Sequence, residues 1–366
     1  MRRDCLPPWR SDSRLVVKLG GAKTDNKLKS ILVIKPSSLG DVVHTLPAVS
    51  LVADAHPEAE ITWVINPDFV PLLRGNPDID HIHIFPRGEF RGLGTPTRLW
   101  PWLKVTRKLK PDLALDFQGL LRSALIAKAS GAKEIYGMSD AREGARWFYD
   151  RVAKVNRREH AVERYLKLAK CAGGKIGDEL RCPFPTGDPL PRFDEYPPFI
   201  LLHPFSRGDG KSLSNAVIEE LCAAFRPTRV VIVGRSERKV PISDNAIELT
   251  NQTTLLQLIR LIRVARFIIT VDSGPMHIAA AITDNLLSIH TWTDPRRVGP
   301  YNPDAWVWKN AKLLQVRDLE TARGLRRSRK FKVKHVPAVV ELVRPLVPVD
   351  PMAIEVDSPS SVGRNQ

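Results

Sequence analysis

The stretch ILVIKPSSLGDVVHTLPAV, residues 31–49, decides the fold of this 366-residue chain. Its opening run, 31–35, is short, mostly apolar and rich in β-branched residues, which favours a buried strand. Proline and two serines end the strand. Apolar residues then recur at helical spacing, at Val42, Val43, Leu46, Val49 and Val52. A strand, a tight turn and a helix form the first unit of a parallel α/β sheet, whose ligands bind beyond the carboxyl ends of the strands.

The turn of this stretch carries the first candidate site residues. Ser37, Ser38 and Asp41 follow the predicted strand and are therefore expected at the mouth of a cleft, with Lys35 at its edge. An aspartate beside a helix start is most often a cap that accepts hydrogen bonds from first-turn amides. From this stretch alone, a cap and a catalytic carboxylate are both open for Asp41.

Alternating strands and helices continue through two parts of the chain. Strands are expected at 61–65, 79–84, 113–117, 135–137, 199–203, 229–234, 267–271 and 286–290, and helices at 69–73, 99–110, 120–129, 160–171, 215–225, 255–265, 275–282 and 336–346. This alternation predicts an α/β fold with two Rossmann-like parallel-sheet domains and a cleft between them.

Composition shifts give the predicted domain boundaries. Residues 176–198 are rich in proline and glycine, which indicates a linker. We expect a basic disordered extension at 1–30, an N-terminal domain at 31–175, the linker at 176–198, a C-terminal domain at 199–335, a closing helix at 336–347 and a disordered tail at 348–366.

Composition also limits the class of protein. The net charge of +16 implies an acidic partner, which can be nucleic acid, an anionic membrane surface or an acidic small substrate. The four cysteines are scattered without a CxxC pair, so neither a zinc site nor a disulfide framework is expected, and a reduced cytosolic protein is the default. No apolar run is long enough for a transmembrane helix, and residues 1–30 lack the apolar region of a secretory signal.

A second stretch, VDSGPMHIAAA at 271–281, repeats the logic of the first. A predicted strand leads into an Asp-Ser-Gly turn, and Pro275 then occupies a first helical position, where its missing amide does no harm. The free amides of that helix start form an anion site suited to a phosphate. A capped helix with an incidental histidine is the alternative. The candidate residues here are Asp272, Ser273, Gly274 and His277.

Two polar loops extend the candidate site. The loop HPFSRGDGK, 203–211, carries Ser206, Arg207 and Lys211, which are suited to a diphosphate. The loop TDPRRVGPYN, 293–302, carries two arginines after a predicted strand. Each could instead be a solvated surface loop. The sequence contains neither GxxxxGK[ST] nor GxGxxG, which disfavours a P-loop NTPase and an ordinary dinucleotide dehydrogenase.

Five segments in order resemble glycosyltransferase family 9, the bacterial ADP-heptose:lipopolysaccharide heptosyltransferases. They are the opening stretch, DFQGLLRSALIA (116–127), HAVERYLKLA (160–169), VDSGPMHIAAA and TDPRRVGPYN. The Gln-Gly-Leu and His-Ala-Val-Glu-Arg segments most resemble heptosyltransferase I, which adds the first heptose to Kdo. The resemblance implies a GT-B fold, with the acceptor on the N-terminal domain and the nucleotide sugar on the C-terminal domain. It also implies inverting transfer without a metal or other cofactor.

The resemblance assigns roles residue by residue. Asp41 matches the general base that takes the acceptor hydroxyl proton, and Lys211 matches the lysine that steadies the departing diphosphate. The nucleotide-sugar site is expected to contain Ser206, Glu237, Asp272, Ser273, Gly274 and His277, with Glu237 assigned to the ribose. The acceptor site is expected to contain Lys35, Ser38, Gln118 and Arg142. The expected partners are ADP-heptose, Kdo-lipid A and the anionic cytoplasmic face of the inner membrane, to which the protein would bind peripherally.

Three alternatives remain. A family member with another nucleotide sugar or glycan acceptor is permitted by the short, basic segment 234–247. A nucleic-acid-binding protein would use the net charge and the basic run RGLRRSRKFKVK at 323–334, although that run is better suited to a solvated surface or anionic lipid. A catalytically silent relative is disfavoured because Asp41, Lys211 and Asp272 are all present.

Overall fold

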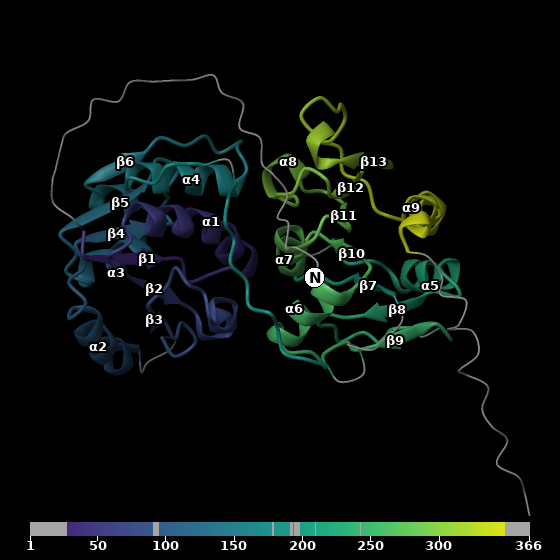
Figure 1. Cartoon of the computed structure of the whole chain (residues 1–366), viewed down its shortest axis with the longest axis horizontal. Coiled ribbons are helices and arrows are strands. Elements are labelled where there is room, and N and C mark those ends of the chain that lie inside the picture. The colour runs from purple at the N-terminus through teal and green to yellow at the C-terminus, as the bar shows by residue number, and fades with distance from the viewer. Residues whose placement is uncertain are drawn as a thin grey trace, which may run out of the picture. The chain divides into compact units, whose positions relative to one another are not determined.

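The computed structural model divides the chain into two compact units, Met1–Pro185 and Thr186–Gln366, and each is described here by itself (Figure 1). The structure describes residues 28–90, 95–177, 179–190, 193, 198–208, 210–241 and 243–347. The division between the units falls within the predicted linker segment 176–198. The first strand already begins at Ser30, and the rest of the predicted 1–30 extension up to residue 27 and the whole 348–366 tail lie outside the described residues.

The N-terminal unit is built on a six-stranded parallel sheet in the order β3-β2-β1-β4-β5-β6. Its strands are β1 (Ser30–Ile34), β2 (Glu60–Ile65), β3 (His81–Ile84), β4 (Leu113–Asp116), β5 (Glu134–Met138) and β6 (Arg151–Ala153). Its helices are α1 (Leu39–Ala55), η1 (Pro67–Leu73), α2 (Thr95–Thr106), α3 (Leu121–Ala129), η2 (Ala145–Phe148) and α4 (Ala161–Cys171). The strand order reverses between β1 and β4, and ligands of such sheets bind at that reversal.

The C-terminal unit is built on a seven-stranded sheet in the order β13-β12-β11-β10-β7-β8-β9, in which the last strand is antiparallel. Its strands are β7 (Phe199–His203), β8 (Arg229–Ile232), β9 (Ala246–Glu248), β10 (Phe267–Val271), β11 (Leu286–His290), β12 (Trp306–Lys309) and β13 (Lys312–Gln315). Its helices are α5 (Asn215–Ala224), α6 (Leu255–Val264), α7 (Gly274–Ile282), α8 (Pro295–Val298), η3 (Val316–Asp318), η4 (Val333–His335), α9 (Val336–Val343) and η5 (Arg344–Leu346).

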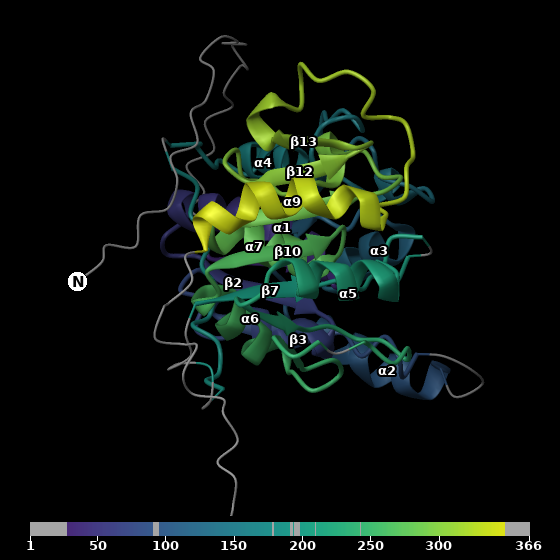
Figure 2. The ribbon, with the colours of Figure 1, turned by 90° about the vertical axis from the view of Figure 1, so that its right-hand side faces the viewer.

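Burial explains why the central strands were readable from the sequence. Every residue of β7, β10 and β11 is buried, as expected for strands covered by helices on both faces, and their apolar runs match the predicted ranges. Helix α9 presents Val336, Val339 and Val343 to the core of this unit and packs against α5. Figure 2 shows α9 and α5 in front of the sheet, on the same face.

Several element predictions were wrong. The predicted helix 99–110 is α2, which ends at Thr106, where the side-chain hydroxyl donates a hydrogen bond to the carbonyl oxygen of Trp102. The 69–73 segment is part of a 3-10 helix rather than an α-helix. Four strands were missed, namely β6, β9, β12 and β13. The last two form a hairpin whose turn residues Asn310 and Ala311 have positive φ, a hairpin signal that the sequence carried.

The described part of the chain has no helix with the length and hydropathy needed to span a membrane. Within the same residues, no group of three or more His, Cys, Asp or Glu side chains is placed to hold a metal ion. Cys171, Cys182 and Cys222 are free thiols.

Candidate functional site

Asp41 lies in the first turn of α1, directly beyond the carboxyl end of β1. Its Oδ2 accepts hydrogen bonds from the Ser38 backbone amide at 3.1 Å and from the Ser38 hydroxyl at 2.7 Å. Its Oδ1 accepts a hydrogen bond from the Tyr165 hydroxyl at 3.2 Å. The side chain is nevertheless 38% exposed. The carboxylate therefore tethers the helix start and still faces solvent, so capping does not exclude a role in proton transfer.

Lys35 stands behind this carboxylate, inside the unit. Its Nζ donates to the Phe117 carbonyl oxygen at 2.9 Å and to the Tyr165 hydroxyl at 2.8 Å, and it lies 3.9 Å from Asp41 Oδ1. The side chain is 3% exposed, so Lys35 is buried and does not lie at the edge of a cleft as the sequence predicted. Burial lowers the pKa of Lys35, while the carboxylates of Asp41 and Asp116 raise it. The ammonium stays inside because carbonyl, hydroxyl and carboxylate oxygens surround it.

Tyr165, on α4, joins these two groups and was not predicted as a site residue. It is buried, and burial together with the nearby Asp41 charge raises the pKa of its hydroxyl well above the usual value. The hydroxyl therefore stays protonated, accepts from Lys35 and donates to Asp41. A tyrosine on the apolar face of the predicted 160–171 helix was the available signal, because a buried phenol needs a hydrogen-bond partner.

Asp116 ends β4 and holds the turn that carries Gln118. Its Oδ1 accepts from the backbone amides of Gln118 at 2.9 Å and Gly119 at 3.0 Å. Its Oδ2 accepts from the hydroxyls of Ser123 at 2.9 Å and Tyr149 at 2.7 Å. Burial raises the pKa of Asp116, and these hydrogen bonds work against that rise. The turn is thus fixed by a buried carboxyl group with four donors.

Arg142 is connected to the same turn through the backbone. Its amide donates to the Gly119 carbonyl oxygen at 2.9 Å, and its side chain is exposed. Gly119 has φ of +66°, a conformation that side chains rarely adopt. The structure therefore brings the predicted acceptor residues Gln118 and Arg142 next to one another.

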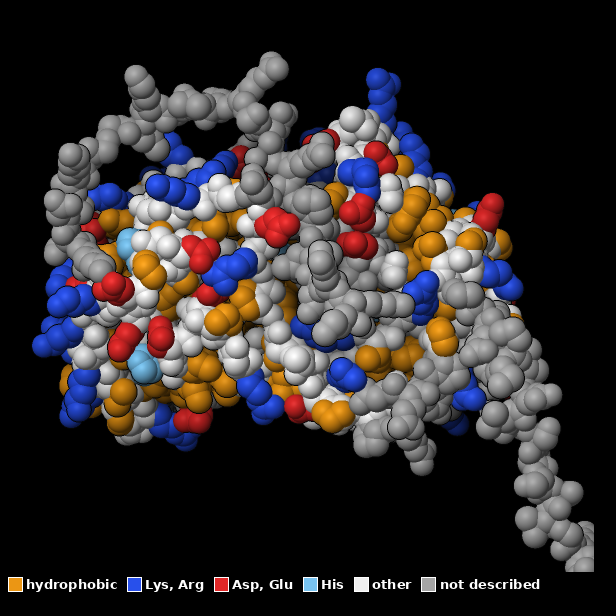
Figure 3. All heavy atoms as spheres, viewed as in Figure 1, with side chains coloured by type: hydrophobic (Ala, Val, Ile, Leu, Met, Phe, Trp, Pro, Cys, Tyr) orange, Lys and Arg blue, Asp and Glu red, His pale blue; other side chains and the backbone are white. Residues whose placement is uncertain are grey.

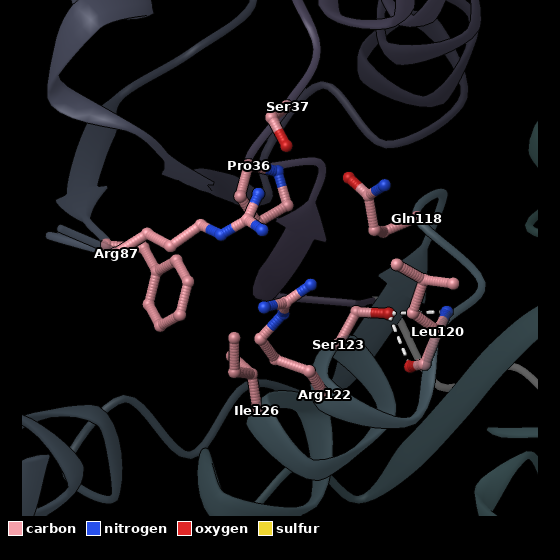
Figure 4. Close-up of a pocket in the computed structure, with 9 residues that line it drawn as sticks. Pro36, Ser37, Arg87, Gln118, Leu120, Arg122, Ser123 and Ile126 are labelled. Carbon is pink, nitrogen blue, oxygen red and sulfur yellow. Dashed lines mark hydrogen bonds between the residues drawn. The ribbon is translucent and has the colours of Figure 1, made fainter. Parts of the chain in front are cut away.

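A pocket of about 210 Å³ opens beyond the carboxyl ends of β1, β3 and β4 (Figure 4). In Figure 4 the guanidinium groups of Arg87 and Arg122 point into the same space, and the Gln118 amide faces it from another side. The Gln118 Oε1 atom is buried without a hydrogen-bond partner among the described residues. The pocket is lined by Pro36, Ser37, Phe85, Arg87, Gln118, Leu120, Arg122, Ser123 and Ile126.

The two arginines suit an anionic ligand. A guanidinium group binds carboxylate and phosphate through two parallel hydrogen bonds. Neither Arg87 nor Arg122 was predicted as a site residue. The signal for Arg122 was its place in the DFQGLLRSALIA segment, four residues after Gln118. Arg87 follows the short strand β3, and no local motif marks it.

In the C-terminal unit, Lys211 and Asp272 form an ion pair of 2.7 Å between Nζ and Oδ2. The lysine side chain is 18% exposed and the aspartate 6%, so the lysine is the more exposed partner of the pair. Ser206 is beside it, and its hydroxyl donates to the Asp272 carbonyl oxygen at 3.2 Å. The predicted catalytic lysine and two residues of the predicted nucleotide-sugar site, Ser206 and Asp272, are therefore brought together, the latter two across 66 positions of sequence.

The groups around Asp272 set its ionisation. Burial works to raise the pKa of Asp272, but the neighbouring His290 and Lys211 side chains lower it overall, Lys211 in part through its hydrogen bond. Burial lowers the pKa of His290 to about 4, so this ring is neutral near neutral pH. The Lys211 ammonium also lies 4.7 Å from the ring centre of Trp292, which is 52% exposed.

Helix α7 begins directly after this ion pair. Ser273 is its N-cap residue, Gly274 its first residue, and its first turn contains no acidic side chain. The Ser273 hydroxyl lies 3.4 Å from Nδ1 of His203, whose pKa burial lowers to about 4. His277 is buried in the same helix. A helix start with a lysine ammonium beside it is suited to phosphate oxygens.

The two remaining predicted features relate differently to this cluster. Glu237 is exposed in the loop after β8, and no hydrogen bond or ion pair between described residues links it to Lys211 or Asp272. The 293–302 loop reaches the cluster through Thr293, whose side chain hydrogen-bonds Asp272, and its arginine Arg296 is paired with the Asp294 carboxylate at 2.6 Å.

Comparison with known proteins gives one family. The model of glycosyltransferase family 9 (heptosyltransferase) matches residues 102–321. Lipopolysaccharide heptosyltransferase 1 of Pseudomonas aeruginosa is 29% identical over 295 residues, which are 74% of this chain and 81% of that protein. The enzyme of the same name from Escherichia coli K12 is 27% identical over 298 residues, 76% of this chain and 92% of that one. Lipopolysaccharide heptosyltransferase 3 of Escherichia coli is 24% identical, over 70% of this chain and 81% of that protein.

Solved structures give the same architecture. E. coli heptosyltransferase WaaC with ADP has a TM-score of 0.66 at 21% identity, covering 86% of this chain and 99% of that one. E. coli ADP-heptose lps heptosyltransferase II has a TM-score of 0.69 at 20% identity, covering 87% and 98%. The predicted α/β fold class is confirmed. The chain belongs to glycosyltransferase family 9, the lipopolysaccharide heptosyltransferase family, and is a transferase with the GT-B fold.

Proposed function

We propose that this protein is an inverting heptosyltransferase that transfers heptose from ADP-L-glycero-D-manno-heptose to Kdo of the lipopolysaccharide inner core. The observation that carries the proposal is a solvent-facing carboxylate, Asp41, on the same sheet edge as a pocket with two arginines. Kdo is an acidic sugar, so its carboxylate suits the arginines while its hydroxyl needs a base. The curated relatives named lipopolysaccharide heptosyltransferase 1 support the same step.

Asp41 is the proposed general base. An acceptor hydroxyl oxygen attacks the anomeric carbon of the heptose, the bond from that carbon to the diphosphate oxygen breaks, and the hydroxyl proton passes to the Asp41 carboxylate. Ser38, Tyr165 and Lys35 hold the carboxylate in place. Proton transfer to the carboxylate is expected late, when the attacking oxygen has become acidic.

The Lys211 cluster is the proposed diphosphate site. The ammonium and the amides at the start of α7 would face the negative charge that develops on the leaving diphosphate. Asp272 would orient the ammonium, and Ser206, Ser273, Gly274 and His277 would complete the nucleotide-sugar site. For this chemistry, Asp41 and the start of α7 must reach the same donor. E. coli WaaC has been solved with ADP and with ADP-2-deoxy-2-fluoro heptose, which supports ADP-heptose as the donor.

The acceptor site is proposed to combine the two-arginine pocket with Ser38, Gln118 and Arg142, while Lys35 acts indirectly through Asp41. The unpartnered Gln118 oxygen can accept a hydrogen bond from an acceptor hydroxyl. Glu237 is proposed to contact the donor ribose. Because Kdo-lipid A is anchored in a bilayer, the protein is proposed to work peripherally at the cytoplasmic face of the inner membrane.

A second candidate is a different step of the same family. The relatives named lipopolysaccharide heptosyltransferase 3, which match 70% of this chain, favour it. Two features could select a different nucleotide sugar. They are Trp292, beside Lys211, and the short, basic segment 234–247.

Mass-spectrometric assay of transfer tests these proposals. Purified protein is incubated with ADP-heptose and a Kdo-terminated acceptor, and in parallel with an already heptosylated acceptor and with UDP-sugars. We expect the Kdo acceptor to gain one heptose only from ADP-heptose. Transfer to the heptosylated acceptor alone would favour the second candidate, and transfer only from a UDP-sugar would refute the proposed donor.

A further inference from the structure

We infer that the N-terminal unit carries a membrane-docking surface formed by α2, α3 and η2, whose partner is an anionic lipid bilayer. The inference deepens the proposed function, because it says which face of the protein meets the membrane that holds the acceptor. Helix α3 contacts both α2 and η2, so the three elements form one continuous surface. The docking surface is defined by the exposed apolar side chains Trp100, Val105, Leu121, Leu125 and Trp147.

The apolar side chains of this surface are large and exposed. Trp147 is 90% exposed, Trp100 62% and Leu125 48%. Single exposed apolar residues need no explanation, but several on neighbouring elements mark an interaction site. Tryptophan in particular is enriched at the membrane–water interface, where its ring meets both apolar and polar surroundings.

The charges of the surface select the kind of partner. Residues 97–110 contain five Lys or Arg and no Asp or Glu, and residues 119–132 contain two Lys or Arg and again no acidic residue. Residues 139–150, around η2, carry Arg142 and Arg146 together with Asp140, Glu143 and Asp150, so α2 and α3 supply the basic part of the surface. The Lys104 ammonium lies 5.8 Å from the ring centre of Trp100, so cation and aromatic ring are already side by side. Over α2, at the lower left of Figure 3, Lys and Arg side chains are interspersed with hydrophobic ones. Cations beside exposed apolar groups fit the headgroups and acyl boundary of an anionic bilayer.

Helix α3 links this surface to the acceptor pocket. Its outer face presents Leu121, Leu125 and Lys128, at the spacing of one helical face, and these side chains are exposed. The same helix supplies Arg122 and Ile126 to the pocket. A bilayer in contact with the outer face of α3 would therefore hold a lipid-linked sugar within reach of the pocket.

The basic run 323–334 in the C-terminal unit is a poorer membrane surface. Its exposed side chains are nearly all charged, and Val333, 41% exposed, is the large apolar group that it exposes among the described residues. Such a run offers electrostatic attraction alone, which salt screens. The docking surface adds apolar insertion, which salt does not weaken. The two regions can therefore be separated experimentally.

Vesicle co-sedimentation tests the inference with the full chain. Vesicles of phosphatidylcholine, with or without about one third phosphatidylglycerol, are the probes. We expect binding to the anionic vesicles, and a loss of at least about tenfold in the partition coefficient for the double variant Trp100→Ser, Trp147→Ser. The matched control Val333→Ser, Leu346→Ser, also at exposed apolar positions, should bind normally. A second pair compares Lys104→Ser, Arg107→Ser, Lys108→Ser with Lys330→Ser, Lys332→Ser, Lys334→Ser, and only the first triple variant should lose binding.

The contrary results are distinct. Three results would overturn the inference. They are wild-type binding by the Trp100, Trp147 double variant, loss of binding confined to the 330–334 triple variant, and no binding of the wild-type protein. Tighter binding to duplex nucleic acid than to the vesicles at physiological salt would also overturn it. With a water-soluble Kdo acceptor the double tryptophan variant should keep its turnover, and with a vesicle-embedded acceptor it should lose most of it. If the protein transfers heptose to no Kdo acceptor while its vesicle binding still depends on these tryptophans, the proposed function is refuted and the docking surface is retained.

Discussion

Each unit carries an aspartate–lysine pair beyond the carboxyl ends of its strands, but with opposite partners exposed. In the N-terminal unit both residues belong to one strand–turn–helix segment, the Asp41 side chain is 38% exposed, and Lys35 is buried behind it. In the C-terminal unit Asp272 follows β10 and Lys211 comes from the loop after β7, and the lysine is the more exposed partner, at 18% against 6%. Under the proposed function the first pair would offer a proton acceptor to its ligand, and the second would offer a cation.

The largest effect is expected from removal of the exposed carboxylate. Asp41→Asn keeps the shape of the side chain but removes its basicity, so turnover should fall by at least about a hundredfold while donor binding is unchanged. Steady-state kinetics and donor titration measure the two quantities. Ser38→Ala is the control, because it removes one hydrogen bond to Asp41 and leaves the carboxylate. Near-normal turnover of Asp41→Asn would reduce Asp41 to a helix cap.

Removal of the Lys211 cation should have a comparable or slightly smaller effect. Lys211→Ala takes away a positive charge opposite the leaving diphosphate, and turnover should fall by about a hundredfold. Lys211→Arg should restore part of it, because the charge is kept. Arg207→Ala, in the same loop, is a matched control for loss of a nearby cation. If Lys211→Ala turns over normally, the ion pair with Asp272 is only structural.

The acceptor pocket should affect binding rather than turnover. Arg122→Ala removes one of two guanidinium groups that point into the pocket, so the KM for an acidic acceptor should rise by about tenfold, with the donor KM unchanged. Lys128→Ala, on the same helix but outside the pocket, is the control. An equal rise in the donor KM would place Arg122 outside the acceptor site.

A smaller effect is expected from the group that joins the carboxylate to the buried ammonium. Tyr165→Phe removes the hydroxyl that donates a hydrogen bond to Asp41 and accepts one from Lys35. The hydroxyl then no longer separates the Lys35 ammonium from the Asp41 carboxylate. Turnover should fall by about threefold to tenfold, because the carboxylate loses a hydrogen bond that orients it. Phe117→Leu, which keeps the backbone acceptor of Lys35, should leave turnover unchanged. Unchanged turnover in Tyr165→Phe would show that the tyrosine only packs.

The smallest effect is expected from the two buried histidines near the Lys211–Asp272 pair. Burial lowers the pKa values of His203 and His290 to about 4 from an ordinary value of 6.5. Between these values the unfolded chain binds more protons than the folded one, so stability is full above about 6.5 and falls as the pH drops toward about 4. The midpoint of thermal unfolding should fall by several degrees across this window, and His290→Gln should reduce the fall. A midpoint that stays constant from pH 7 to 4.5 would mean that these rings are charged in the folded protein.

The sequence by itself determined the central strands, the turns and the residue types at them. The ranges of β7, β10 and β11 were predicted as observed, because strands buried on both faces must be continuous apolar runs. Asp41 and Asp272 were identified because each directly follows such a run. The short strands β6 and β9 and the hairpin β12–β13 were missed, since strands of three or four residues carry too little periodicity to stand out.

Tertiary structure decided which way each charged pair points. Lys35 meets Tyr165 across 130 positions, and Lys211 meets Asp272 across 61. Arg87 and Arg122 enter one pocket from a loop and a helix that local spacing does not connect. Burial is a property of the packed unit, because a lysine is held inside only where folding supplies oxygens to replace water. The sequence therefore identified the charged residues that follow the strands, and packing decided which member of each pair is the more exposed.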